Sequence, residues 1–260
     1  MVVHINKGLQ NRKKIYFVSD VHLGAPALKD NKIRETLFVR WLNEISPAAA
    51  EIYLMGDIFD FWFEYKSVVP RGFTRVLAKL AELTEKGIPV HFFTGNHDAW
   101  VFDYLPSETG VILHREPLQT ELFGKKFFLA HGDGLDADDR GYLILRKIFT
   151  SRTLQRFFSW LHPNIAFGIA HKWSEFGRKS KSIAGHDFRN EEEGIYKFAE
   201  SVIRNGHVDF FVFGHRHRIA DMKVGDSSRM ILLGEWIESY SYGIFDGEQF
   251  EVNKYQNRNV

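Results

Sequence analysis

The sequence predicts an α/β fold in which β-strands alternate with α-helices. Two observations lead to this prediction. Short apolar runs rich in β-branched and aromatic residues recur along the chain, and stretches with apolar residues at helical spacing lie between them. The strand-like runs are IYFVSD (15–20), EIYLMGD (51–57), VHFFTGN (90–96) and FFVFGH (210–215).

The first half of the chain follows this alternation closely. Helices are expected around Ile33–Glu44 and near Gly72–Lys86, each between two strand-like runs. The second helix should end at Gly87, because glycine favours a left-handed C-cap and Pro89 cannot continue a helix. The elements expected after the third strand are a short apolar segment at 111–113 and a hairpin over 118–132 whose turn is Gly124-Lys125.

The stretch from about residue 133 to residue 181 breaks the pattern, because its apolar residues recur at helical spacing without an intervening strand. These residues are Leu143, Ile144, Leu145, Ile148, Phe149, Leu154, Phe157, Phe158, Trp160 and Leu161. We therefore expect helices inserted between two halves of a sheet. A helix over 194–206 then returns to the last strand-like run, and β-structure over 229–236 and 241–252 closes the fold.

Composition excludes several classes of protein. The formal net charge is +1, which does not favour nucleic acid as a partner. There is no cysteine, which excludes disulfides and thiolate metal ligands and agrees with a reducing compartment. The first fourteen residues lack an apolar signal core, and no stretch approaches the roughly 18 apolar residues that span a bilayer. We expect a cytoplasmic protein that is soluble or attached at a membrane surface.

Five short motifs contain residue types that bind divalent metals, and each follows an apolar, strand-like run. They are Asp20-Val21-His22, Gly56-Asp57-Ile58-Phe59-Asp60, Gly95-Asn96-His97-Asp98, His131-Gly132-Asp133 and Gly214-His215-Arg216-His217. Ligands at the ends of strands meet along one rim of a sheet. A mixed set of carboxylates, an amide and imidazoles can hold two cations side by side for hydrolysis. The sequence therefore predicts an enzyme that cleaves a phosphate ester.

A two-metal centre needs one carboxylate that bridges the ions, and Asp57 is the residue placed to do so. Asp20 and His22 are two residues apart at a strand end, so both can reach one ion. His215 and His217 repeat this spacing. The two ions would lower the pKa of a shared water towards neutrality and supply the attacking hydroxide. The other expected ligands are the neutral amide of Asn96 and the imidazole of His131.

This set resembles the calcineurin-like metallophosphoesterase superfamily, whose motifs DxH, GDxxD, GNH(D/E), GH and GHxH occur in the same order. The resemblance extends from Asp20 to His217, with Ala130-His131 in place of Gly-His. It implies a four-layer α/β/β/α sandwich that forms a single domain over residues 1–260, with a helical lid inserted at about 140–182. The implied ligands are Asp20, His22, Asp57 and His217 for one ion, and Asp57, Asn96, His131 and His215 for the other.

The resemblance places His97 beside the scissile phosphate, as a general acid or a stabiliser of the transition state. The alternative is a histidine that only donates a hydrogen bond within its loop. Asp60 and Asp98 are expected to hold neighbouring histidines or loop backbone instead of binding metal. The implied catalytic residues are His97, Asp57 and Asn96.

The inserted segment suggests which phosphate ester is cleaved. From Arg146 to Lys181 there are eight Lys or Arg and a single acidic residue, Glu175, and the stretch is rich in Phe and Trp. A basic, aromatic helical segment suits a membrane surface or an acyl-chain substrate. The alternative is a helical cap that packs on the sheet with a solvated basic face.

The segment from His131 to Asp139 is similar to the HGDxLxxDD element of the UDP-2,3-diacylglucosamine hydrolase family, which acts in lipid A synthesis. Tyr142, Arg146 and the segment 233–236 also resemble that family. The resemblance implies hydrolysis of UDP-2,3-diacylglucosamine to UMP and 2,3-diacylglucosamine 1-phosphate. It implies two divalent metal ions, commonly Mn²⁺, although this ligand set also accepts Fe, Zn or Co. The implied substrate contacts are Asn96, His97, Asp139, Ser180 and His215.

By the same resemblance the insertion forms a lid over the acyl chains, and its basic, aromatic surface would place the protein on the cytoplasmic face of the inner membrane. One position departs from that family, whose members typically have Arg after Gly-Asn where this chain has His97. Two alternatives therefore stay open. One is a soluble phosphodiesterase or nucleotide phosphatase of the same superfamily. The other is a non-catalytic binding module, which missing ligands would favour, but all seven ligand residues are present. The oligomeric state stays open.

Overall fold

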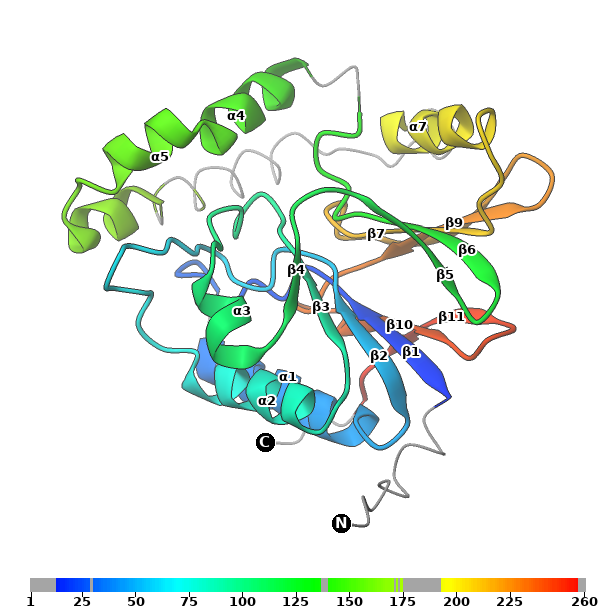
Figure 1. Cartoon of the computed structure of the whole chain (residues 1–260), viewed down its shortest axis with the longest axis horizontal. Coiled ribbons are helices and arrows are strands. Elements are labelled where there is room, and N and C mark those ends of the chain that lie inside the picture. Colours follow the sequence, from blue (N-terminus) through cyan, green and yellow to red (C-terminus); the bar gives the residue numbers. More distant parts are fainter. Residues whose placement is uncertain are drawn as a thin grey trace, which may run out of the picture.

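The computed structural model describes residues 13–28, 30–136, 140–170, 172, 174 and 193–256. Its core consists of two β-sheets with helices on both outer faces, which confirms the predicted α/β sandwich (Figure 1). Among the described residues no helix is both long and apolar enough to cross a membrane.

The first sheet has six strands in the order β11-β10-β1-β2-β3-β4. Its strands are β1 Lys14–Val18, β2 Ala49–Leu54, β3 Val90–Phe93, β4 Ile112–His114, β10 Ser241–Phe245 and β11 Phe250–Lys254. Strands β1 to β4 run parallel, whereas β10 is antiparallel to β1. Strand β1 therefore lies between a strand from the first quarter of the chain and one from its last.

The second sheet has five strands in the order β5-β6-β7-β9-β8. Its strands are β5 Leu118–Leu122, β6 Lys125–Leu129, β7 Phe210–Phe213, β8 Ile219–Val224 and β9 Ser228–Leu233. The three central strands are parallel, and the two edge strands are antiparallel to their neighbours. Both sheets thus have parallel centres, which bring the carboxyl ends of several strands to one rim.

Helices cover the sheets from outside, and a separate helical group lies to one side of them (Figure 1). The covering helices are α1 Asn31–Ile45, α2 Thr74–Glu85 and α3 Tyr104–Thr109 on the first sheet, and α7 Gly194–Ile203 on the second. The separate group contains α4 Arg140–Thr150, α5 Arg152–Phe158 and a further helical stretch over 163–170. Helices were expected in this part of the sequence, and the remainder of the expected insertion lies outside the described residues.

Alternation of side chains along the strands produces three stacked apolar layers. In β1, Val18 packs with Trp41 of α1, whereas Phe17 faces the second sheet and stacks on Phe127. In β6, the next residue, Phe128, points outward and packs under α7. Full burial of an aromatic side chain such as Phe17 stabilises the fold by about 1.5–3 kcal/mol.

The hairpin turn differs by one residue from the sequence prediction. Lys125 is already paired with Leu122, so the two connecting residues are Phe123 and Gly124. Both have positive φ, 48° and 76°, as a type I′ hairpin turn requires. The prediction of Gly124-Lys125 is therefore wrong, because glycine occupies the second turn position here and not the first.

Two short elements were not expected from the sequence. Helix α3 has six residues and includes Pro106, so it shows little periodicity. Strand β8 lies at the edge of its sheet, and its exposed and half-buried residues alternate without a marked apolar run. Neither element changes the position of the rim that carries the motifs.

Candidate metal centre

The five motifs meet at one rim that spans both sheets. Each follows the carboxyl end of a strand: β1, β2, β3, β6 and β7 in turn. Backbone hydrogen bonds connect their loops, from Asp20 N to Gly56 O (3.1 Å) and from Gly214 N to His131 O (2.8 Å). The predicted substrate contacts Asp139 and Ser180 lie outside the described residues.

Two groups of predicted ligands have their donor atoms within 4.8 Å of one another: Asp20 with His22 and His217, and Asp57 with His131 and His215. In the first group, His217 Nε2 lies 3.1 Å from Asp20 Oδ1. In the second, His131 Nε2 lies 3.4 Å from Asp57 Oδ2.

Asp57 also connects the two groups. The same oxygen, Asp57 Oδ2, lies 3.9 Å from His22 Nε2 in the first group. Asp57 therefore lies where the sequence placed the bridging ligand.

The backbone at these positions is unusual. Among the described residues other than glycine, nine have positive φ, and five of those are predicted ligands. These five are Asp20, His22, Asp57, His215 and His217, with φ between 47° and 65°. Left-handed backbone is uncommon outside glycine, although Asp and His adopt it more often than most residues, and it clusters at functional sites. The conformation turns each loop directly after its strand, which concentrates ligands in a small volume.

Motif glycines allow the loops to approach closely. A Cβ at Gly95 would lie 2.2 Å from Asp57 Oδ1, and a Cβ at Gly56 would lie 2.6 Å from His131 Nδ1. Gly56 also has a φ of +93°, which side chains rarely adopt. Any larger residue at these two positions would displace a ligand.

Two histidines have their ring orientation fixed by a second contact. His22 Nδ1 lies 3.2 Å from the Asp60 carboxylate, and His131 Nδ1 donates to the carbonyl of Met55 at 2.8 Å. Metal-binding histidines usually donate their other ring N–H to such an acceptor. In both residues Nε2 is then the nitrogen available as a ligand.

Several buried polar atoms at the rim lack a well-directed hydrogen bond within the described residues. They are Asp20 Oδ1, Asn96 Oδ1 and His131 Nε2. The first and third are near charged groups, at 3.1 Å and 3.4 Å, but without the geometry of a hydrogen bond. Unsatisfied buried oxygens and nitrogens are costly unless another group coordinates them. The donor set therefore fits a divalent cation.

The electrostatics of the centre also favour a bound cation. Burial alone would raise the pKa of Asp57, but the positive charges of His131 and His97 outweigh it and hold that pKa well below its usual value. Burial would lower the pKa of His131, whereas Asp57 and Asp20 hold it well above its usual value. The buried carboxylates thus attract positive charge, which a divalent cation can supply in place of protons.

Asp98 connects the loops of the second and third motifs through backbone hydrogen bonds. Its carboxylate accepts backbone N–H groups from Gly95 at 2.7 Å and Ile58 at 2.8 Å, with longer contacts to Asp57 and Phe59. Burial and the charge of Asp57 raise the pKa of Asp98 to about 7. Asp98 therefore holds loop backbone, as the sequence suggested, and connects the second and third motifs.

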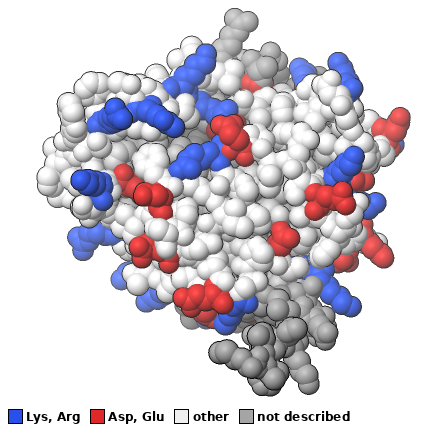
Figure 2. Space-filling view, in the orientation of Figure 1, with Lys and Arg blue, Asp and Glu red and all other residues white. Residues whose placement is uncertain are grey.

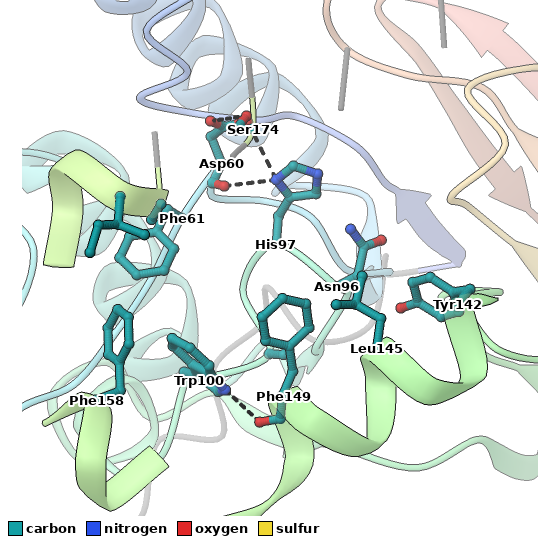
Figure 3. Close-up of a pocket in the computed structure, with 13 residues that line it drawn as sticks. Asp60, Phe61, Asn96, His97, Trp100, Tyr142, Leu145, Phe149, Phe158 and Ser174 are labelled. Atoms are coloured by element: carbon teal, nitrogen blue, oxygen red, sulfur yellow. Dashed lines mark hydrogen bonds and ion pairs between the residues drawn. The ribbon is translucent and has the colours of Figure 1, made fainter. Parts of the chain in front are cut away.

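His97 lies beside the ligands and partly faces solvent, with 22% of its side chain exposed. Its backbone N–H donates to Asp57 Oδ1 at 2.8 Å, and its ring Nδ1 donates to the backbone carbonyl of Asp60 at 2.8 Å. These two contacts orient the ring so that Nε2 is the nitrogen available to a substrate. Figure 3 shows His97 beside Asn96 at a hollow lined by aromatic side chains.

Some contacts of the centre had no signal in the sequence. Ser174, from the inserted segment, donates to Asp60 Oδ2 at 2.9 Å, and Ser19 donates to Asp20 Oδ2 at 2.5 Å. Trp100 Nε1 donates to the carbonyl of Phe149 at 2.7 Å and so connects the third motif to α4. Single serines carry no pattern that would mark such a contact. Trp100 is only two residues after Asp98, and this closeness to the third motif was a signal that it lies near the site.

The sequence profile of the calcineurin-like phosphoesterase family matches residues 13–218. The chain belongs to this family. That result confirms the predicted superfamily and shows that the chain is an enzyme of the phosphoesterase class. Its metal ligands are candidates drawn from the geometry described above.

Proteins named UDP-2,3-diacylglucosamine hydrolase are similar over most of this phosphoesterase. The one from Porphyromonas gingivalis is 42% identical over 249 residues, which cover 91% of this chain and 95% of the relative. The one from Haemophilus influenzae is 30% identical over 234 residues, with 88% and 93% covered. A solved archaeal phosphodiesterase is 16% identical, covers 93% of this chain and 99% of its own, and has a TM-score of 0.47.

Proposed function

We propose that this phosphoesterase hydrolyses the diphosphate of UDP-2,3-diacylglucosamine to UMP and 2,3-diacylglucosamine 1-phosphate. The observation that carries the proposal is an apolar hollow that opens directly beside the candidate metal ligands. The names of the similar hydrolases support it, because the similarity extends over most of both chains.

The apolar hollow has a volume of about 140 Å³ and is lined by residues from three parts of the chain (Figure 3). Its apolar walls include Phe61, Trp100, Leu145, Phe149, Phe158 and Ile169. Asn96 and His97 line the same hollow, so an apolar group bound here would lie next to the reacting phosphate. Such a surface favours a hydrocarbon segment over a polar sugar or base. The volume is small for a ligand pocket, so it would hold part of an acyl chain.

Two divalent cations, with Mn²⁺ preferred, would be held by the seven residues predicted from the sequence. The oxygen- and nitrogen-donor set of the two groups joined by Asp57 supports this proposal. When bound, the cations neutralise phosphate oxygens and lower the pKa of the attacking water.

His97 is the residue proposed to act on the leaving group. The attacking water would give up one proton to bulk solvent, its oxygen would form a bond to the α-phosphorus, and the bond from that phosphorus to the bridging oxygen would break. The bridging oxygen leaves with the sugar phosphate, and a protonated His97 would donate a proton to it from Nε2. The contacts of Nδ1 and of the backbone N–H hold the ring in place for this step.

The proposed lid also has an apolar outer surface, which supports a peripheral position on a membrane. Of the large apolar side chains that are exposed among the described residues, most belong to residues 144–169. Trp160 is 79% exposed, Ile144 62% and Phe157 56%. Figure 2 shows a group of Lys and Arg side chains at the upper left, where α4 and α5 lie in Figure 1, and further basic side chains along the other edges of this face. Exposed apolar residues next to basic ones suit an anionic lipid surface.

The function is tested by comparing substrates on the Mn²⁺-loaded protein. UDP-2,3-diacylglucosamine should be cleaved far faster than UDP-glucose or bis-p-nitrophenyl phosphate, with UMP as a product. Phe158→Ala should impair cleavage of the diacylated substrate alone, because Phe158 lines the apolar hollow. Its neighbour Phe157 is outside that lining, so Phe157→Ala is the matched control when the substrate is presented in detergent micelles, where the proposed membrane contact of Phe157 plays no part. Equal or faster cleavage of the simple esters would favour the soluble phosphodiesterase or nucleotide phosphatase instead.

A further inference from the structure

A second hollow adjoins the candidate metal centre on the other side of α4. Its volume is about 490 Å³, which is within the usual range of roughly 300–1,000 Å³ for a ligand pocket. Four residues line both hollows: Asn96, Ala99, Tyr142 and Phe149. Because Asn96 is one of the predicted metal ligands, both hollows reach the place where the reacting phosphate would lie.

Helices α4 and α5 contribute apolar side chains to one hollow and polar side chains to the other. On α4, Leu145 lines the apolar hollow, whereas the next residue, Arg146, lines the second hollow. On α5, Phe158 lines the apolar hollow, whereas Gln155 lines the second. The same two helices therefore present an apolar wall to one side and a polar wall to the other.

The second hollow is rich in cationic side chains. Arg115, Arg146 and Arg152 line it, together with Glu116 and Asp133. Asp133 is already engaged, because it accepts a hydrogen bond from Tyr142 and lies 3.7 Å from Arg146.

The other two arginines have no such partner. Within the described part of the chain, neither Arg115 nor Arg152 forms an ion pair with an acidic side chain. Arg115 instead donates to the carbonyls of Val101 and Phe102, which fixes its guanidinium at the wall. The hollow can thus receive a polar ligand that carries negative charge.

We infer that this second hollow binds the nucleotide half of the substrate, a uridine 5′-monophosphate unit, during the reaction. The inference rests on the proposed function, which supplies a diphosphate with an acylated sugar on one side and a nucleoside on the other. The apolar hollow suits the first side and the arginine-lined hollow suits the second. Arg152 and Arg146 are placed for phosphate or ribose oxygens, and Glu116 and Gln155 offer polar groups to the base.

The test compares two arginines of the same helix. Arg152 lines the second hollow, whereas Arg156, also exposed and one helical turn later, lines neither hollow. Arg152→Glu and Arg156→Glu change the net charge equally, so any long-range electrostatic effect is matched. Binding of UMP to the Mn²⁺-loaded full chain is measured by calorimetry, with inorganic phosphate as the comparison anion.

Arg152→Glu should weaken UMP binding about tenfold, which corresponds to about 1.4 kcal/mol, while Arg156→Glu changes it less than twofold. The KM for UDP-2,3-diacylglucosamine should rise in Arg152→Glu and stay within twofold of the wild-type value in Arg156→Glu. Equal UMP affinity in the two variants would overturn the inference, as would UMP binding no tighter than phosphate.

These outcomes are distinct from a failure of the proposed function. If the wild type cleaves the diacylated substrate but Arg152→Glu behaves like Arg156→Glu, the nucleotide site is wrong and the function stands. If the wild type does not cleave that substrate, the function is wrong. A selective loss of UMP binding in Arg152→Glu would then still support a nucleotide site in the second hollow.

Discussion

Removal of the Asp60 carboxylate tests whether His22 depends on a second contact to bind metal. The carboxylate is buried, lies 3.2 Å from His22 Nδ1 and accepts the hydroxyl of Ser174 at 2.9 Å. In Asp60→Ala, His22 loses the acceptor that fixes its ring and tautomer. The backbone carbonyl of residue 60 remains, so the 2.8 Å contact to His97 Nδ1 is kept. The removed carboxylate also lies 3.6 Å from His97 Nδ1, but the shorter contact of that nitrogen to the carbonyl stays. The variant therefore acts mainly on His22 and keeps the closer contact that orients the proposed proton donor.

The expected loss of metal affinity follows from the kind of contact that is removed. Removal of a residue that orients a metal-binding histidine lowers metal affinity about 10–100-fold. This range corresponds to about 1.4–2.7 kcal/mol. The loss should affect the site that contains His22 and not the site that contains His131, because His131 is oriented by the carbonyl of Met55.

Isothermal titration of the metal-free protein with Mn²⁺ measures this change. Ser174→Ala is the matched control, because it removes the other partner of Asp60 and leaves the contact to His22 intact. Circular dichroism on both variants would show whether they are folded. An unchanged Mn²⁺ affinity in folded Asp60→Ala would refute the reasoning. An equal loss in Ser174→Ala would show that the effect passes through the inserted segment and not through His22.

Four further predictions concern other parts of the molecule. Asp57→Ala should lose activity and at least one metal ion, and retention of two ions by metal analysis would remove it from the bridging role. His97→Ala should keep its metal but lower turnover about 10²–10⁴-fold, and an unchanged rate on the natural leaving group would contradict a general acid. Trp160→Ser should lower the affinity for anionic vesicles, measured by co-sedimentation, about 10–100-fold, since burial of such a side chain contributes about 1.5–3 kcal/mol; equal binding would exclude that contact. Burial and the charge of His91 lower the pKa of His114 to about 4, so only the unfolded chain gains this proton as pH falls from about 6.5. As pH falls from 6.5 to 4, urea unfolding should therefore show a less favourable change in stability for the wild type than for His114→Asn.

The sequence predicted that the candidate ligands meet at one rim, because these residues follow strands directly. Asp20, Asp57 and His131 each stand one to three residues after an apolar run, and parallel strands bring such ends to one rim. The contact of Ser174 with Asp60 could not be predicted, because it joins residues 114 positions apart through an isolated serine. Pairing information of this kind is absent from local patterns.

The limits of the fold prediction have a similar cause. Strand β8 was not expected, because its alternating residues lie at a sheet edge and lack a continuous apolar run. The hairpin turn was placed one residue late, since a glycine can serve either turn position and only the pairing of Leu122 with Lys125 decides. The pairing of β1 with β10 has no local signal, because more than 220 residues separate the two strands.

That pairing of β1 with β10 has a consequence for how the enzyme is made. A ribosome releases the amino-terminal part of a chain first, and domains tend to fold as their segments emerge. Asp20 and His22 emerge from the ribosome early. Their partner His217 emerges only when most of the chain is complete, and so does Trp236, whose N–H donates to the Asp20 carbonyl. A growing chain therefore cannot assemble the full ligand set. Assembly of the candidate metal centre, and with it the ability to cleave phosphate esters, therefore belongs to the last stage of synthesis.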